Sequence, residues 1–379
     1  MNKLLILTDD NHFFSDSYKI PDGMNVDTLI KLFSAKGYDI QSYTITEIDW
    51  SADFSDTAVL YPYSKLSGLF YKGYIEDILL RLHYKGARLL PDFLCFRAHQ
   101  NKIFMELMRQ DFKHQELKTI NSVCFGSLQG MLNYFDTAKQ TGNSSLMKFP
   151  MVLKLSVGSR GRGVFKIHSM EHLIKTVNKM TVVYLRDFQS FFYRNIANNK
   201  TARVTQIIKN IARKIAGAQQ VRYLIISHKF VLQPYIADLP GDYSVWVLGR
   251  KFYVKYRSNT VSDFRFSASG ISSFPELNDE VVKILDFAEL AYEEINSPAV
   301  CLDIAYDGRI CHLIEFQCLS FSSNHIISSN GWFIKDTQWS FNDGKSTLEE
   351  DFANAVDYYL RNHQAYIAVC GVLPKAECR

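Results

Sequence analysis

The sequence predicts an α/β protein built from more than one domain. Strands alternate with amphipathic helices in the first hundred residues, a glycine-rich loop joins two strands near residue 158, and a turn near residue 307 joins two strands that carry carboxylates. A chain of 379 residues is long enough for two or three domains with their own cores. Its hydrophobic content of 47% and charged content of 22% are those of an ordinary globular protein.

Composition excludes several other classes. No apolar run approaches the length that spans a bilayer. The apolar run Leu4 to Leu7 is short and is followed by acidic residues, so it predicts a buried first strand and not a signal peptide. Seven scattered cysteines without C-x-x-C spacing indicate reduced thiols, so we expect a cytoplasmic protein without a zinc or disulfide framework.

The first hundred residues predict a parallel sheet. We expect strands at 4–7, 39–43, 58–61 and 88–90, and helices at about 25–36 and 71–84. Strands that alternate with helices favour parallel pairing. No G-x-G-x-x-G follows the first strand, so dinucleotide binding there is unsupported. A loop from Pro91 to Arg97 is the expected first domain boundary, and a helix should open at about His99.

The segment from Phe149 to Ile167 predicts a strand, a glycine-rich loop and a second strand. Three glycines and two arginines within six positions let backbone amides approach an anion while guanidinium groups supply charge. The G-K-[ST] of a P-loop is missing, and a strand follows the loop where a P-loop has a helix. Lys154 would direct an ammonium group at a phosphate. A hairpin tip with solvated arginines explains the pattern equally well.

Polar residues recur on the strands that follow. A strand at 230–236 precedes a hairpin that turns at Gly249-Arg250, and a further hairpin turns at Asp307-Gly308. Asp303 lies on the first strand of this second hairpin, and Glu315 and Gln317 share one face of the other strand. Two carboxylates and an amide oxygen suit Mg²⁺ with a nucleotide phosphate, whereas a half-exposed hairpin with a wet polar face is the simpler alternative.

The order of these features resembles the ATP-grasp superfamily: a helix with a lysine, K-x-x-x-G-x-x-G-x-G-V, a linker strand followed by an acid, a basic strand, and two metal carboxylates. The match covers about residues 99 to 330. The resemblance implies an N-terminal Rossmann-like pre-ATP-grasp domain at 1–98. It also implies an N-terminal lid subdomain at 99–232 and a C-terminal subdomain with the metal site at 233–379.

The resemblance assigns roles by position. Lys102 and Lys154 match the lysines on the α- and β-phosphates, and Gln233 stands where a glutamate often contacts adenine. Asp242 matches the acid at the ribose, and Arg265 matches the basic residue near the γ-phosphate, with Arg257 and Lys255 as neighbouring candidates. The implied catalytic residues are Arg265, Lys154 and Arg257. The implied ATP-binding residues are Lys102, Lys154, Ser156, Gly158, Gly161, Gly163, Gln233, Tyr235, Ile236 and Asp242. The implied ligands of two Mg²⁺ ions are Asp303, Glu315 and Gln317.

The sequence departs from the superfamily pattern in three places. Gln317 stands where asparagine is usual, so the amide oxygen lies one methylene further out. Pro234 occupies a polar linker position, and Cys301 stands where peptide-forming members often carry arginine. These changes put the substrate class in doubt more than nucleotide binding.

The resemblance implies an ADP-forming carboxylate–amine ligase that acts through an acyl phosphate. Its expected partners are a small-molecule, saccharide or peptide carboxylate and an amine, and a homodimer is left open. A second hypothesis is an inactive nucleotide sensor or scaffold. A third is a basic module that binds a polyanion or membrane surface.

The third hypothesis depends on residues 185–222, which hold eight basic residues and one acid. Isoleucines and a valine recur there at helical spacing, so we expect a basic amphipathic helical insertion. It would contact an anionic acceptor or an anionic membrane surface, or form a solvated face of the fold. Nucleic acid is not expected, because no nucleic-acid motif accompanies the charge.

Overall fold

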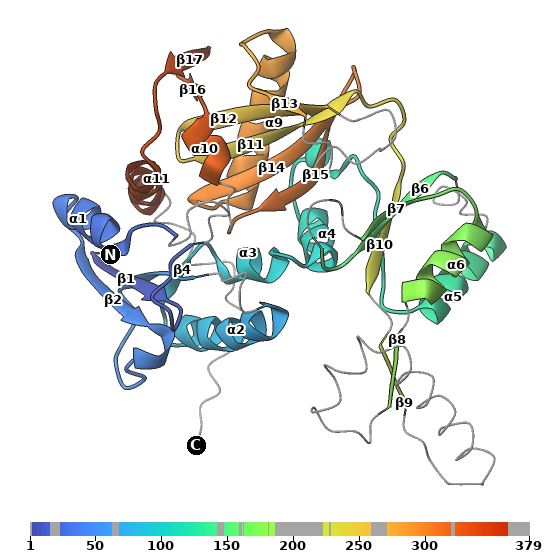
Figure 1. Cartoon of the computed structure of the whole chain (residues 1–379), viewed down its shortest axis with the longest axis horizontal. Helices are drawn as coiled ribbons and strands as arrows, with labels where there is room; N and C mark the ends of the chain where they lie inside the picture. The colour runs from blue at the N-terminus through green and yellow to red at the C-terminus, as the bar shows by residue number, and fades with distance from the viewer. Residues whose placement is uncertain are drawn as a thin grey trace. The chain divides into compact units, whose positions relative to one another are not determined.

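The computed structural model describes residues 2–15, 23–62, 68–141, 148–158, 161, 163–180, 182–185, 223–226, 229–258, 271–319 and 323–362 (Figure 1). The chain divides into two compact units. Unit 1 comprises Met1–Asn121, Val157–Gly163 and Ile236–Arg379, and unit 2 comprises Ser122–Ser156 and Val164–Tyr235. The boundaries expected after residues 98 and 232 stay predictions.

Unit 1 begins with a four-stranded parallel sheet in the order β2-β1-β3-β4. Its strands are β1 (Lys3–Thr8), β2 (Asp39–Thr44), β3 (Thr57–Leu60) and β4 (Arg88–Leu90). Helix α1 (Val26–Ala35) connects β1 to β2, and α2 (Gly68–Tyr84) connects β3 to β4. The side chain of Asn25 caps α1 by accepting from the backbone N–H of Thr28. The alternation of strands and helices therefore predicted this sheet correctly.

The expected loop from Pro91 to Arg97 is wrong, because the short helix α3 (Phe93–Ala98) occupies it. Asp92 caps α3 by accepting from the N–H of Leu94, and burial of Phe96 holds the helix against the sheet. The next helix, α4 (Lys102–Gln110), does not open at His99. Gln100 adopts a left-handed backbone with φ of 52°, which separates the two helices, and Asn101 caps α4.

A second sheet of unit 1 carries the two predicted hairpins. Its order is β15-β14-β11-β12-β16-β17, with β13 paired to β12, and all pairs are antiparallel. The strands are β11 (Gly241–Leu248), β12 (Lys251–Ser258), β13 (Ser272–Ser273), β14 (Ala299–Tyr306), β15 (Cys311–Gln317), β16 (Gly331–Lys335) and β17 (Trp339–Asp343). The turns at Gly249-Arg250 and Asp307-Gly308 confirm both hairpins.

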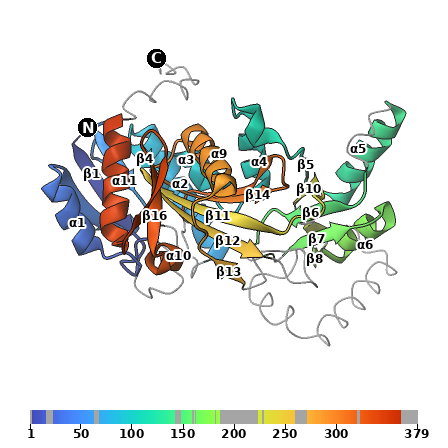
Figure 2. The same cartoon turned by 90° about the horizontal axis from the view of Figure 1, so that it is seen from above.

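Two helices cover this second sheet. Helix α9 (Asp279–Ile295) packs its apolar side chains against one face, where Val245, Leu302 and Phe316 are buried (Figure 1). Helix α11 (Leu348–Asn362) lies beside α1 in both views (Figures 1 and 2). Phe352 and Val356 of α11 share one core with Leu4 of the N-terminal sheet and Phe33 of α1. The two sheets of unit 1 therefore form one packed body. The short helix α10 (Ser323–Ser328) and the single turns η1 (Ile45–Glu47) and η2 (Gln115–Lys118) complete it.

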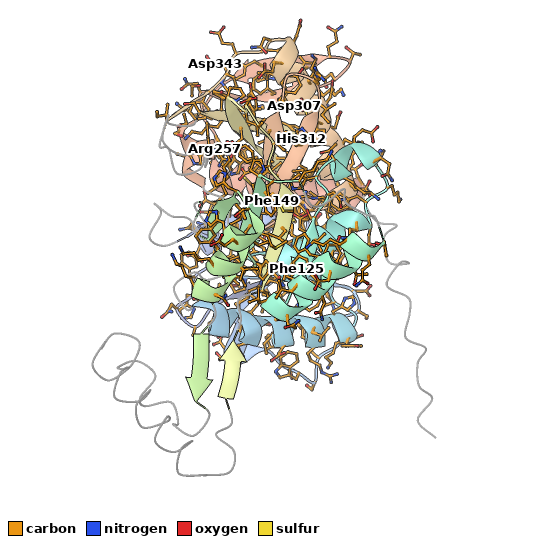
Figure 3. All side chains as sticks on the ribbon, turned by 90° about the vertical axis from the view of Figure 1, so that its right-hand side faces the viewer. Phe125, Phe149, Arg257, Asp307, His312 and Asp343 are labelled. Atoms are coloured by element: carbon orange, nitrogen blue, oxygen red, sulfur yellow. The ribbon has the colours of Figure 1, made fainter. Side chains whose placement is uncertain are left out.

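The described residues of unit 2 include a four-stranded antiparallel sheet with helices packed on it. Its order is β5-β10-β6-β7, built from β5 (Val123–Phe125), β6 (Met151–Leu155), β7 (Val164–Ile167) and β10 (Phe230–Pro234). Helices α5 (Leu128–Gln140) and α6 (Met170–Met180) pack on it around a core that contains Phe125, which Figure 3 labels. The strand, loop and strand expected at 149–167 are confirmed as β6 and β7.

The predicted basic insertion lies outside the described residues, apart from its first residue. Strands β8 (Val182–Leu185) and β9 (Tyr223–Ile226) flank it and pair antiparallel. Within the part of the chain that the structure describes, no helix has both the length and the apolar character that crossing a membrane requires.

Candidate functional site

The second sheet of unit 1 has an apolar face under α9, and its other face is polar at the end of β11 that carries Asp242 and Ser244 but apolar further along, at Trp246 and Leu248. Side chains alternate along β11, so Tyr243 and Val245 enter the core under α9 while Asp242 and Ser244 point to the other side. Across the sheet, Ser244 pairs with Asp303 on β14, and Asp303 pairs with Glu315 on β15. Three adjacent strands thus place acidic and hydroxyl groups on one surface.

The metal ligands predicted from the sequence come together on this surface. Asp303 and Glu315 are direct cross-strand partners, and Gln317 pairs with Cys301 one step further along the same face. The amide nitrogen of Gln317 donates to Oε1 of Glu315 over 3.3 Å. The Oγ of Ser244 donates to Oδ1 of Asp303 over 2.7 Å. Like charges directly opposite one another repel, so this pair needs neighbouring cations.

Arg257 supplies one of these cations. Its Nε and Nη2 donate to the two oxygens of Asp242 over 2.7 Å and 2.5 Å, and Nη2 lies 3.0 Å from Oδ1 of Asp303. Figure 3 labels Arg257. Burial opposes the charge of Arg257, but Asp303 and Asp242 together raise its pKa above the ordinary value. Burial raises the pKa of Asp242 to about 6, although Arg257 lowers it. One guanidinium thus joins the predicted ribose acid to a predicted metal ligand.

Lys102 supplies the second cation. It is the first residue of α4, and its Nζ lies 3.4 Å from Oε1 of Glu315. The same Nζ donates to the backbone carbonyl of Gly158 over 2.9 Å. The lysine that the resemblance assigns to a phosphate therefore contacts a metal carboxylate and the glycine-rich loop.

Four of the residues expected around the adenine and the phosphates lie in unit 2, namely Lys154, Ser156, Gln233 and Tyr235. Lys154 is buried on β6, between β10 and β7. The side-chain amide of Gln233 donates to Oγ of Ser122 over 2.8 Å, and Lys166 lies over the ring of Tyr235 at 3.7 Å from its centroid. The backbone N–H of Ser156 donates to the carbonyl of Lys229 over 2.8 Å. Ile236 belongs to unit 1. The roles of these residues stay predictions.

The glycine-rich loop is described in part. Gly161 and Gly163 have φ values of 68° and 78°, a left-handed conformation that favours glycine, and Gly158 has a φ of 148°. Ser159, Arg160 and Arg162 lie outside the described residues, and so does Arg265. The catalytic role expected for Arg265 stays a prediction. Lys255, its neighbouring candidate, lies with Nζ 2.7 Å from Nδ1 of His325.

Sequence reasoning missed three side chains beside these carboxylates. Ser244 holds Asp303, and its place two residues after Asp242 on one strand was the available signal. Glu106 and Arg109 form an ion pair on α4, four and seven residues after Lys102, where helical spacing puts them on the face of Lys102.

His312 stabilises the turn of the carboxylate hairpin. Its Nε2 lies 3.1 Å from Oδ2 of Asp307, and its Nδ1 lies 2.9 Å from Oγ1 of Thr119. Asp307 accepts from the N–H groups of Arg309 and Ile310, and these backbone bonds, together with His312, lower its pKa to about 2. The histidine therefore holds the turn of this hairpin, and a register shift between Ile304 and Asp303 then brings Asp303 opposite Glu315.

The donor set fits a hard divalent cation. Asp303, Glu315 and Gln317 offer carboxylate and amide oxygens, the ligands that Mg²⁺ takes in proteins. Among the residues described here, no group of three or more histidine, cysteine, aspartate or glutamate side chains is arranged to hold a metal.

Comparison with known proteins identifies the fold. No family model matches the sequence, and no curated protein matches it either. The structure of a D-alanine–D-alanine ligase from Bacillus anthracis, complexed with ATP, is similar to this chain with a TM-score of 0.50 at 13% identity. The similarity covers 96% of this chain and 98% of the ligase.

Weaker likenesses include a RimK-domain ATP-grasp protein from Sphaerobacter thermophilus, with a TM-score of 0.46, 11% identity, and coverage of 94% and 99%. A D-cycloserine synthetase gives a TM-score of 0.48 at 13% identity, with the same coverage. The match to the D-alanine–D-alanine ligase spans nearly the whole of both chains. The chain therefore has the ATP-grasp fold.

Proposed function

We propose that this protein is an ATP-dependent, ADP-forming ligase that joins a carboxylate to an amine. The observation that carries the proposal is the cross-strand pair of Asp303 and Glu315, each with a cation beside it, on the polar face of an ATP-grasp fold. A solvated hairpin does not need two carboxylates matched to an arginine and a lysine from other elements. The D-alanine–D-alanine ligase of the same fold is complexed with ATP, which supports the choice of nucleotide.

The reaction follows from the charges at this face. An oxygen of the substrate carboxylate attacks the γ-phosphorus of ATP, the bond to the β–γ bridging oxygen breaks, and ADP leaves. The amine nitrogen then attacks the acyl carbon, loses a proton, and displaces inorganic phosphate. Phosphoryl transfer of this kind depends on positioning and charge neutralisation more than on covalent help from the protein.

The residues of this chain divide the task. Lys102 and Lys154 would contact phosphate oxygens, and Gln233 would orient adenine. Asp303, Glu315 and Gln317 would hold one or two Mg²⁺ ions. Bound there, Mg²⁺ would withdraw charge from the transferring phosphate. Arg257 would keep Asp242 and Asp303 in fixed orientations, because it contacts both.

The test is the substitution Glu315→Gln, which keeps the shape of the side chain and removes its charge. The control is Glu289→Gln, which removes a carboxylate from a partly exposed pair with Lys335 in the same unit. With ATP, Mg²⁺ and mixtures of amino acids and amines, Glu315→Gln should form no ADP, while Glu289→Gln and wild type should behave alike. Both variants should melt near the wild-type temperature.

Two outcomes would count against the proposal. ADP formation by Glu315→Gln at the wild-type rate would show that this carboxylate is not a metal ligand. A wild-type protein that binds ATP no better with Mg²⁺ than without it, as measured by calorimetry, would overturn the ligase proposal itself.

A further inference from the structure

Helix α4 carries two buried charged side chains that the proposed reaction does not use. Glu106 and Arg109 are each 2% exposed, and Oε1 of Glu106 lies 3.3 Å from Nη2 of Arg109. Lys102 precedes them by four and seven residues, so all three side chains share one face of the helix. The phosphate lysine and the buried pair therefore point in the same direction.

Packing alone gives no reason to keep this pair. Removing two ions from water costs several kcal/mol for each ion, and well-packed apolar side chains of similar volume are often as stabilising or more so. Met105, Phe104 and Met108 already pack this helix into the core under the second sheet. The fold would accept two further apolar residues at these positions.

The pair contacts the strand that carries Glu315. Nη2 of Arg109 donates to the carbonyl of Ile314, the residue directly before Glu315, over 3.4 Å. Burial lowers the pKa of Arg109, while Glu106 and Glu315 oppose that shift, so the charge of Glu315 acts on the guanidinium. Among the described residues, Nε and Nη1 of Arg109 have no hydrogen-bond partner. Arg109 is thus a cation that contacts the backbone next to Glu315, and its ion pair with Glu106 leaves Nε and Nη1 without a hydrogen bond among the described residues.

We propose that Arg109, oriented by Glu106, is a positioning residue for the metal carboxylate Glu315. The inference rests on the proposed function, in which Lys102 leaves Glu315 to contact a phosphate. Glu315 then still faces Asp303 directly across the strands. Arg109 is buried and bonded to the carbonyl of Ile314, so it remains in place as the cation that offsets this repulsion and fixes the backbone at Ile314.

The test is the double variant Glu106→Leu/Arg109→Met, which removes both charges together and leaves neither buried alone. Binding of Mn²⁺ in the presence of ADP is measured by electron paramagnetic resonance, and binding of ADP without metal is measured by calorimetry. The double variant should melt at or above the wild-type temperature and bind ADP normally without metal. Its Mn²⁺ affinity should fall by about tenfold or more, the usual effect of losing an outer partner of a metal ligand.

The matched control is Lys251→Met/Asp351→Asn, which removes another largely buried ion pair of unit 1, with 2.6 Å between Nζ and Oδ1. Lys251 lies at the far end of β12 from Arg257, about 20 Å along the strand at 3.3 Å per residue. Asparagine keeps an acceptor for Tyr253 and Ser346. This control should bind Mn²⁺ with ADP as the wild type does.

The outcomes separate this inference from the proposed function. Wild-type protein that binds no Mn²⁺ with ADP would overturn both. Wild-type binding that the Glu106→Leu/Arg109→Met variant matches would overturn the positioning role alone. If that variant fails to fold, Glu106→Gln is measured in its place. It keeps the side-chain shape, frees Arg109 from its partner, and should weaken Mn²⁺ binding but not metal-free ADP binding. Equal Mn²⁺ affinity would again overturn the positioning role.

Discussion

Replacing Arg257 with glutamine should destabilise unit 1 by about 3–5 kcal/mol at pH 8, the usual result of removing one partner from a buried ion pair. The side chains of Arg257 and Asp242 are 18% and 6% exposed, so solvent screens their pairing little. Two hydrogen bonds to Asp242 and one contact to Asp303 would be lost together. Two carboxylates would then face one another on the polar surface without the guanidinium between them.

The loss of unfolding free energy in Arg257→Gln should grow as the pH rises. The pKa of Asp242 is raised to about 6 in the folded protein, above the value of about 3.9 expected for an unfolded chain. Between these values the folded state holds more protons, so the contribution of Asp242 to stability falls as the pH rises. Without Arg257 the pKa should rise further and extend this window upward. At pH 5 the carboxyl of Asp242 is mostly protonated in both proteins, so the loss of stability should be smaller there than at pH 8.

The assay is urea unfolding at pH 5 and pH 8, followed by tryptophan fluorescence. All four tryptophans, Trp50, Trp246, Trp332 and Trp339, belong to unit 1, so the signal reports on that unit. Arg250→Gln is the control, because its ion pair with Asp336 is exposed and should contribute about 0.5 kcal/mol or less. Adding Asp242→Asn to Arg257→Gln should recover much of the loss. The reasoning would be refuted if Arg257→Gln had the wild-type unfolding free energy at pH 8. It would also be refuted if the loss of stability grew as the pH fell.

Three further substitutions test other parts of the site. Lys154→Ala should weaken ATP binding by about 1–3 kcal/mol, the scale of hydrogen bonds to charged groups, and leave adenosine binding unchanged in calorimetry; equal losses would contradict a phosphate role. Ser244→Ala removes the 2.7 Å hydrogen bond to Asp303 and should weaken the binding of Mn²⁺ in the presence of ADP by about tenfold or less. An equal loss in the affinity for adenosine would exclude a role at the metal. Changing Lys209, Arg213 and Lys214 together to glutamine should preserve ATP affinity and reduce salt-sensitive binding to anionic vesicles or raise the KM for an anionic acceptor; behaviour like wild type would leave that segment as a solvated face.

Local periodicity in the sequence was sufficient to predict the two hairpins and the N-terminal sheet. Alternation of side chains along β15 places Glu315 and Gln317 on the same face. The direct pairing of Asp303 with Glu315 depends in addition on a register shift between Asp303 and Ile304, which the sequence pattern did not predict. The N-terminal sheet followed in the same way from strands that alternate with helices. The exception is α3, whose six residues are too few for a periodic pattern to stand out. Its capping residue, Asp92, was the one available signal.

Contacts that depend on strand order could not be predicted in this way. Arg257 lies on β12 and Asp303 on β14, and β11 separates the two strands. Only a long side chain that crosses β11 joins them, and nothing in the local pattern says which strands are neighbours. The contact of Arg109 with β15 has the same origin, since helix spacing fixes the face of α4 but not the strand on which that face packs.

The charges on the polar face explain why Glu315, more than Asp303, should depend on a nucleotide to bind a metal. Arg257 contacts both Asp303 and Asp242. Because three contacts hold this guanidinium in place, we expect Asp303 to keep its cation when a nucleotide binds. Lys102 is different, because its contact with Glu315 is the longer of its two at 3.4 Å, and a phosphate is a better partner than either present acceptor. A triphosphate that takes Lys102 releases the charge of Glu315 for a divalent cation. Adenosine has no group that does this, so adenosine should leave Glu315 paired with Lys102 and ATP should not.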